Sequence, residues 1–388
     1  MPAPRPVVSG LPAPTPDETA HGARLCAHLR ECIARETPLA SEPEATIGFA
    51  DFMHEALYAP GLGYYAAGAT KLGAAGDFVT APELSPLFAA TLTDAFAPIM
   101  DEGVLELGAG SGRLARDAIA AAPSLDGRWR VLEVSADLRE RQRGALEGAG
   151  VVWLDALPER LRGLVLGNEV LDAIACEIVR HHDGRYEQAR VAIADTGFAW
   201  RWRPLTDDGP LLAAAQVRMP PIAGYQSEIN LRAEALVATL AERLDDGALC
   251  FIDYGFPRRE YYHPERGAGT LACHYRQRVH FDPLQRVGLQ DITAHVDFTA
   301  VAEAAVDAGL QVICYATQAQ FLLHAGLLGR LERQTFASER ERALAIGAVQ
   351  KLLSPAEMGE LFKVLVVGRG EAVAKLGALS AFDQSYRL

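Results

Sequence analysis

A glycine-rich turn is the first chemical feature of the chain. The stretch VLELGAGSGRLARD, residues 104–117, places three glycines between an apolar run and a helix-like pattern, with Glu106 just before them. The three glycines are Gly108, Gly110 and Gly112. Without side chains, they let the backbone N–H groups of a strand-to-helix turn approach a ligand closely. A dinucleotide turn, G-x-G-x-x-G, would need its third glycine at position 113, where this chain has arginine.

Two further acids follow the next two apolar runs. Glu133 lies in VLEVS, where a carboxylate can accept hydrogen bonds from both hydroxyls of a ribose. Asp155 ends VVWLD, where it could meet an adenine amino group. Three strand-end acids beside a glycine turn favour S-adenosylmethionine, which carries an ammonium and a ribose but no pyrophosphate. The alternative is a packing turn and three surface carboxylates.

Polar residues also follow the fourth apolar run, in GNEVLDAIACEIV. They are Asn168, Glu169 and Asp172. A doubly wound sheet binds its substrate at the carboxyl ends of its strands, so these residues are expected beside the methyl acceptor, with Asn168 next to the cofactor. In the alternative interpretation, Asn168 and Asp172 cap the following turn or helix.

The segment DITAHVDF alternates polar and apolar residues. In an extended conformation Asp291, Thr293, His295 and Asp297 would share one face. His295, between two acids, is a candidate to take a proton from the acceptor. The alternative is an edge strand with a polar outer face.

Composition narrows the class of protein. The formal net charge of −13 argues against nucleic-acid binding, which needs a cationic face. Six cysteines are scattered without a CxxC pair, so neither a zinc ribbon nor a disulfide framework is predicted, and no metal site is expected. Reduced thiols are typical of a cytoplasmic protein, which is the predicted location. No apolar window approaches the length of a membrane span.

The elements that position these residues follow from hydrophobic periodicity. Helices are predicted from Glu18 to about Glu36 and from near Gly48 to Pro60. Apolar runs alternating with helical ones from 103 to about 175 are typical of a parallel sheet buried on both faces. A DG turn flanked by alternating residues then predicts an antiparallel hairpin or meander. The predicted divisions are a flexible leader (1–20), a helical and lid portion (21–100), a cofactor-binding half of the core (101–176), a β-rich insertion (177–225), the remaining core (226–370) with a long substrate-side loop (257–298), and a C-terminal tail (371–388).

The chain resembles the MidA family of S-adenosylmethionine-dependent methyltransferases over most of its length. The resemblance rests on GYY (63–65), GDFVTAPELSPLF (76–88), ELGAGSG (106–112), LEVS (132–135), NEVLDA (168–173), IDYGF (252–256), DITAHVDF (291–298) and MGELFKVL (358–365). It implies an α/β class I methyltransferase fold, with a Rossmann-like seven-stranded sheet whose last strand is reversed, an N-terminal helical portion and insertions before the fifth and sixth strands. One departure is Ala175, where family members commonly carry proline.

The resemblance also implies an acceptor. The family includes a mitochondrial enzyme that methylates arginine on a subunit of NADH dehydrogenase, so a protein substrate of that kind is expected. A guanidinium stays protonated in water and needs carboxylates that orient it and receive its proton, which is the work expected of Glu169 and Asp172. On family grounds, GDFVTAPELS folds over the cofactor and offers Asp77, Thr80 and Glu83. The alternatives are a small-molecule methyltransferase and an assembly factor that binds the cofactor without turnover.

Overall fold

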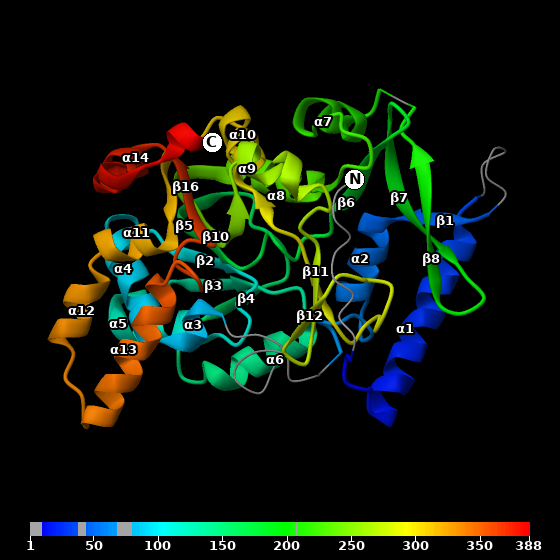
Figure 1. Cartoon of the computed structure of the whole chain (residues 1–388). Coiled ribbons are helices and arrows are strands. Elements are labelled where there is room, and N and C mark those ends of the chain that lie inside the picture. The colour runs from blue at the N-terminus through cyan, green and yellow to red at the C-terminus, as the bar shows by residue number, and fades with distance from the viewer. Residues whose placement is uncertain (1–9, 38–43, 68–79, 207) are drawn as a thin grey trace.

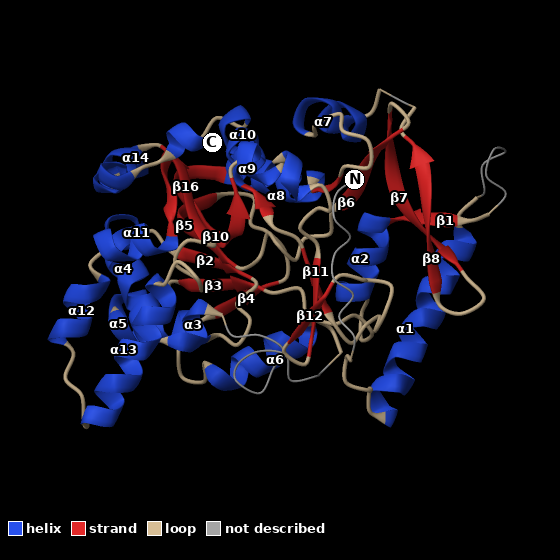
Figure 2. Ribbon diagram, in the orientation of Figure 1, coloured by secondary structure: helices blue, strands red, loops and turns tan. Residues whose placement is uncertain are grey.

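A large, mostly parallel sheet forms the centre of the molecule (Figures 1 and 2). The computed structural model describes residues 10–37, 44–67, 80–206 and 208–388. The seven main strands are β2 (Val104–Leu107), β3 (Trp129–Leu132), β4 (Val152–Leu154), β5 (Leu161–Asn168), β10 (Leu244–Phe256), β15 (Gln311–Thr317) and β16 (Phe362–Arg369). Their order is β15-β16-β10-β5-β2-β3-β4. β16 runs antiparallel to both β10 and β15, which confirms the predicted seven-stranded sheet with a reversed last strand.

Helices bury both faces of this sheet, which is why its strands are apolar runs. One face packs against α4 (Pro86–Met100), α5 (Arg113–Ala121), α11 (Gln318–His324), α12 (Leu327–Arg333), α13 (Glu339–Leu353) and α14 (Glu371–Lys375). The other packs against α8 (Leu231–Arg243) and α10 (Phe298–Asp307). Leu376 and Leu379 are buried in the first of these cores, so part of the predicted C-terminal tail belongs to the folded body. Among the described residues, no helix has both the length and the apolar character needed to cross a membrane.

The N-terminal helices are α1 (Pro16–Arg35), α2 (Phe49–Tyr58) and α3 (Ala81–Leu84). α1 begins inside the stretch predicted as a leader, because Thr15 and Glu18 form a capping box. The Thr15 side chain accepts from the Glu18 N–H, and the Glu18 carboxylate accepts from the Thr15 N–H. The predicted boundary at residue 20 is therefore wrong. α1 and α2 lie together against a second sheet, on the right of Figure 1.

The second sheet is antiparallel and confirms the predicted meander around Asp183–Gly184. Its strands are β1 (Thr46–Gly48), β6 (Glu177–His182), β7 (Arg185–Ile193), β8 (Phe198–Pro204) and β9 (Gln226–Ile229). β9 pairs with β6, so the insertion extends past the predicted boundary at 225, and the core resumes only with α8. β1 pairs with β7 and joins the insertion to the N-terminal helices.

The predicted long loop at 257–298 contains regular structure instead. Its elements are α9 (Arg258–Tyr261), β11 (Ala272–Tyr275), β12 (Arg278–His280), β13 (Asp291–Thr293) and β14 (Val296–Asp297). β11, β12 and β13 form a three-stranded sheet, and β14 pairs with β10. α6 (Ala136–Ala145) and α7 (Pro210–Arg218) complete the longer helices.

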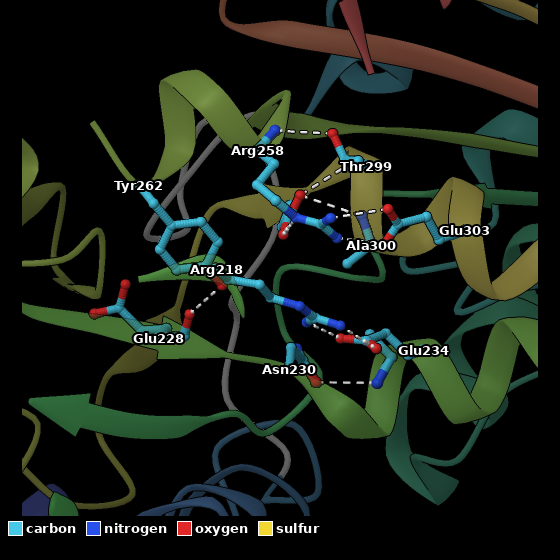
Figure 3. Close-up of polar contacts among 11 residues, drawn as sticks. Arg218, Glu228, Asn230, Glu234, Arg258, Tyr262, Thr299, Ala300 and Glu303 are labelled. Carbon is cyan, nitrogen blue, oxygen red and sulfur yellow. Dashed lines mark hydrogen bonds and ion pairs between the residues drawn. The ribbon is translucent and has the colours of Figure 1, made fainter. Parts of the chain in front are cut away.

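A network of charged side chains ties the insertion to the core (Figure 3). Arg218, at the end of α7, donates two hydrogen bonds to Glu234 on α8, at 2.5 and 2.9 Å. Their side chains are only 12% and 19% exposed. Nearby, Arg258 pairs with Glu303 on α10. The insertion is therefore fastened to α8 by a pair of charges that are largely shielded from water.

Replacing Glu234 with glutamine should destabilise the fold, because it leaves the Arg218 guanidinium without its carboxylate in a shielded position. We expect a loss of about 2–3 kcal/mol in the free energy of unfolding, measured by urea denaturation. The matched control is Glu44→Gln, which breaks a pair with Arg201 whose side chains are 41% and 47% exposed. That change should cost less than about 0.5 kcal/mol. Equal losses in both variants would contradict the prediction.

Candidate active site

A cavity of about 810 Å³ opens at the carboxyl ends of the central strands. β2, β3, β5 and β10 each end on it, as expected for a doubly wound sheet. α2 and the segment after it supply one wall, and the three-stranded sheet supplies another. The candidate residues from distant parts of the sequence meet here.

The glycine turn lines one end of the cavity. Gly108, Gly110 and Gly112 have φ angles of 57°, 55° and 78°, a left-handed conformation that glycine adopts readily. A Cβ at Gly108 would stand 3.3 Å from Val170. Gly112 differs from the other two, because it does not line the cavity: a Cβ there would stand 3.1 Å from Leu146 of the protein interior. Its role in the turn is therefore one of packing.

Two buried carboxylates lie next to the turn. Glu106 accepts a hydrogen bond from the Trp129 indole N–H at 2.8 Å, and burial raises its pKa to about 7. Glu133 accepts from the Ser135 N–H and from the Gln142 side chain, both at 3.0 Å, and burial raises its pKa as well. Both acids line the cavity. They offer negative charge to a ligand that brings an ammonium and ribose hydroxyls.

Asp155 does not lie at this site, contrary to the sequence prediction. Its side chain is 92% exposed and pairs with Arg139 at 2.6 Å. Arg139 also donates to the backbone carbonyls of Glu133 and Leu154, so it holds the end of β4 away from the cavity. Asp155 is not among the residues that line the cavity.

The segment before α4 contributes to the rim. Thr80 lines the cavity, as do Ser111 and Arg113 of the turn. Glu83 accepts a hydrogen bond from the Ser111 hydroxyl and pairs with Arg113 at 3.5 Å, which links α3 to the glycine turn. Asp77 lies outside the described residues.

A second part of the cavity wall is built around a sharp turn after β5, whose Val170 lies next to the glycine turn. Glu169 has φ 53°, a left-handed conformation that is unusual for a side-chain-bearing residue and frequent at functional sites. Asp253, on the neighbouring β10, stabilises the turn, because one of its oxygens accepts the N–H groups of Val170, Leu171 and Asp172. This arrangement brings Asn168, Glu169 and Asp172 to the cavity wall.

Burial disfavours the charged form of both acids of this turn. Burial and the nearby Asp172 raise the pKa of Glu169 to about 8, although the Ala81 N–H and the Asn168 amide donate to it. Burial raises the pKa of Asp172 to about 6, although the Tyr254 hydroxyl donates to it at 2.5 Å. Among the described residues, neither Glu169 nor Asp172 forms an ion pair, and buried oxygens of Asp172 and Asn168 accept no hydrogen bond. A cationic group would fit this part of the cavity.

Several cavity residues were missed by the sequence reasoning. Tyr65 donates to both oxygens of Asp291 at 2.9 Å, and its ring stacks on that of Tyr58 with centroids 5.5 Å apart. The Tyr58 hydroxyl donates to the backbone carbonyl of Ala173. Tyr254 completes this aromatic wall. The motifs GYY and IDYGF contain two of these residues, Tyr65 and Tyr254, but only the resemblance, and no spacing rule, drew attention to them.

The predicted extended strand at DITAHVDF is interrupted. Asp291, Thr293 and His295 line the cavity, but the chain leaves strand conformation at Ala294 and His295. Asp297 turns away and caps α10, because its carboxylate accepts the N–H groups of Thr299 and Ala300. The predicted single polar face therefore ends at His295.

The described residues fit S-adenosylmethionine by their own chemistry. The left-handed glycines leave room above the turn, Glu106 and Glu133 suit an ammonium and a ribose, and Asn168 has a buried oxygen without a partner. Arg113, at the start of the helix that follows the turn, is paired with the carboxylates of Glu83 and Asp117 and is therefore not available to bind a phosphate.

Comparisons with known proteins agree with this geometry. The profile of a family of S-adenosyl-L-methionine-dependent methyltransferases matches residues 89–316. A crystal structure of a protein from Burkholderia thailandensis, bound to S-adenosylhomocysteine, is 42% identical, covers 98% of this chain and 100% of its own, and superposes with a TM-score of 0.88. A mitochondrial protein arginine methyltransferase of Danio rerio is 29% identical over 373 residues, which is 85% of each chain. Its Drosophila melanogaster homologue is 28% identical and covers 92% of this chain and 88% of its own.

The names of these relatives correct the predicted location. The arginine methyltransferases of Danio rerio, Drosophila melanogaster and Caenorhabditis elegans are all named as mitochondrial, which contradicts a cytoplasmic location. The prediction failed because free thiols and the lack of a long apolar segment report on redox state and membrane insertion, and neither specifies one compartment.

The fold, the glycine turn with its two acids, the family profile and the 42% identical relative lead to one conclusion. The chain belongs to the family of S-adenosylmethionine-dependent methyltransferases.

Proposed function

We propose that this methyltransferase acts on the side chain of an arginine in a protein, and that the protein is a subunit of the NADH dehydrogenase type. The named arginine methyltransferases among its relatives support the arginine, and the resemblance to the MidA family supports the subunit. The observation that carries the proposal is that two neighbouring carboxyl groups, those of Glu169 and Asp172, line the cavity and form no ion pair with any described residue.

The cofactor end would be held by Glu106, Glu133, Asn168, Thr80 and the backbone of the glycine turn. When bound there, S-adenosylmethionine supplies an electrophilic methyl group on a sulfonium. The glycine turn would set the orientation of the bound cofactor. The acceptor nitrogen would then have to lie within reach of both the cofactor's methyl group and the Glu169 carboxyl group. Catalysis by such a site comes mainly from orientation.

At the acceptor end, Glu169 and Asp172 would orient the guanidinium and stabilise its charge. A guanidinium has a pKa above about 12, so it enters protonated and must lose a proton once a nitrogen is methylated. Glu169 is placed to receive that proton, because its pKa of about 8 makes it a better base than an ordinary carboxylate. His295, which lines the same cavity and stacks edge-on against Tyr254, would pass the proton outward.

The raised pKa of Glu169 predicts a pH dependence. At pH 7 in the free enzyme this carboxyl is mostly protonated, and only its ionised form attracts a guanidinium. The value of kcat/KM for the protein acceptor should therefore rise with pH. Well below the pKa of Glu169 the rise should approach about tenfold per pH unit, and it should level off above about pH 8. The measurement is made at saturating cofactor, because Glu106 titrates near pH 7. A flat profile from pH 7 to 9 would count against the assignment of Glu169.

The proposal is tested with labelled S-adenosylmethionine and purified NADH dehydrogenase subunits. Label should enter protein and be recovered as methylarginine after acid hydrolysis. Recovery of label only in small molecules of a cell extract would identify a small-molecule methyltransferase instead. Cofactor binding without transfer to any fraction would identify an assembly factor that does not turn over.

A further inference from the structure

Three side chains with metal-ligand chemistry meet where α1 crosses α2, outside the cavity. His28 and Cys32 are one turn apart on α1, and Glu55 on α2 faces them. The His28 Nε2 lies 2.7 Å from the Glu55 Oε2 and 3.6 Å from the Cys32 Sγ. The three ligand atoms all lie within 4.8 Å of one another.

The spacing of Cys32 and His28 matches that of ligands in a tetrahedral metal centre. With Zn–S near 2.3 Å and Zn–N near 2.05 Å, a tetrahedral zinc ion separates its sulfur and nitrogen ligands by about 3.6 Å. The Cys32 Sγ and His28 Nε2 already have this separation. Nitrogen and oxygen ligands would stand about 3.3 Å apart, so the Glu55 carboxylate has to move back by about 0.6 Å. A half-exposed glutamate can make that adjustment.

The charges also suit a divalent ion. One thiolate and one carboxylate neutralise a 2+ charge, and neutral imidazole completes three protein ligands. His28 and Glu55 are each 30% exposed, so water can reach the fourth position. A hydrogen bond between His28 and Glu55 is enough to explain their 2.7 Å contact. It does not explain why the Cys32 thiol lies next to the same imidazole nitrogen.

We propose that His28, Cys32 and Glu55 bind a divalent transition metal, with Zn²⁺ as the ion whose ligand preferences they match. The metal clips α1 onto α2. α2 also carries His54 and Tyr58, which line the cavity, so the clip holds one wall of the active site. The site departs from the sequence-based expectation of no metal, since its ligands come from two helices and form no CxxC or HxxxH pattern.

Cobalt titration of the full-length, reduced and metal-stripped protein tests the proposal independently of any methyl acceptor. We expect one equivalent of Co²⁺ to produce the visible bands of a tetrahedral site and a near-ultraviolet thiolate-to-cobalt charge-transfer band. Cys32→Ser should remove the charge-transfer band and weaken Co²⁺ binding at least about tenfold. Cys26→Ser is the matched control, because Cys26 lies on the same helix and outside the cluster, and it should change neither.

Zn²⁺ should also raise the melting temperature of the wild-type protein and of Cys26→Ser, but not that of Cys32→Ser. The circular dichroism of each variant before metal is added reports whether it is folded. A charge-transfer band that survives in Cys32→Ser, a wild type that binds no stoichiometric Co²⁺, or equal stabilisation of all three proteins by Zn²⁺ would overturn the proposal.

Discussion

Glu169→Gln should lower kcat for methyl transfer to the protein acceptor by about 10²- to 10⁴-fold, the range observed when a positioned general base is lost. Glutamine keeps the shape of the side chain and can still accept hydrogen bonds from the Ala81 N–H and the Asn168 amide. It cannot ionise, so it neither attracts a guanidinium nor receives its proton. The measurement is single-turnover transfer of labelled methyl at saturating cofactor.

The affinity for S-adenosylmethionine separates this effect from misfolding. It should stay within about threefold of the wild-type value, because Glu169 is not among the residues proposed to hold the cofactor. The matched control is Glu177→Gln. Burial also raises the pKa of the Glu177 carboxyl group, but this side chain does not line the cavity. It should transfer methyl at close to the wild-type rate. Full activity in Glu169→Gln would remove this residue from the mechanism.

Glu133→Ala should weaken S-adenosylmethionine binding by about 10²- to 10³-fold. The carboxylate lines the cavity, where we propose that it accepts bonds from two ribose hydroxyls, and a hydrogen bond to a charged group contributes about 1.5–3 kcal/mol. Calorimetric titration with the cofactor or with S-adenosylhomocysteine measures the change without any acceptor.

Asp155→Ala provides a sharp control for this measurement, since the sequence assigned Asp155 to the same ligand. In the structure its side chain is 92% exposed and pairs with Arg139. The variant should therefore bind the cofactor within about twofold of wild type, as expected for an exposed ion pair that does not line the cavity. A loss comparable to that of Glu133→Ala would show that the end of β4 moves to the cavity when the cofactor binds.

The sequence alone was sufficient for the fold class and for much of the cavity. Apolar runs alternating with helical ones require parallel strands, and the carboxyl ends of parallel strands meet at one edge. Glu106 lies near the end of one such strand, and Glu133 and Glu169 directly follow two others, so they had to come close whatever the insertions did. The glycine turn and Glu106 lie within seven residues of each other, so their arrangement is set by local backbone geometry and can be predicted from their spacing in the sequence.

The failures have a common physical cause, which is that spacing does not report where a strand lies in the sheet or what packs on its end. β4 is the edge strand, and Arg139 from α6 pairs with Asp155 outside the cavity. Strict alternation would put Asp297 on the same face as Asp291. Instead, the Asp297 carboxylate accepts two N–H groups at the N-terminus of α10. For Asp155 a neighbouring helix determined the direction of the side chain, and for Asp297 the start of the helix that follows it did.

The sequence by itself determined the central sheet, the cofactor and the glycine turn, because each depends on contacts between residues close in sequence or on the ends of adjacent parallel strands. Only the tertiary structure decided the acceptor wall. Tyr65 and Asp291 are 226 positions apart and meet through a single pair of hydrogen bonds, and Asp253 shapes the turn at 170–172 from a neighbouring strand. Such contacts form only when segments far apart in the chain pack together, and no periodicity along the chain encodes them.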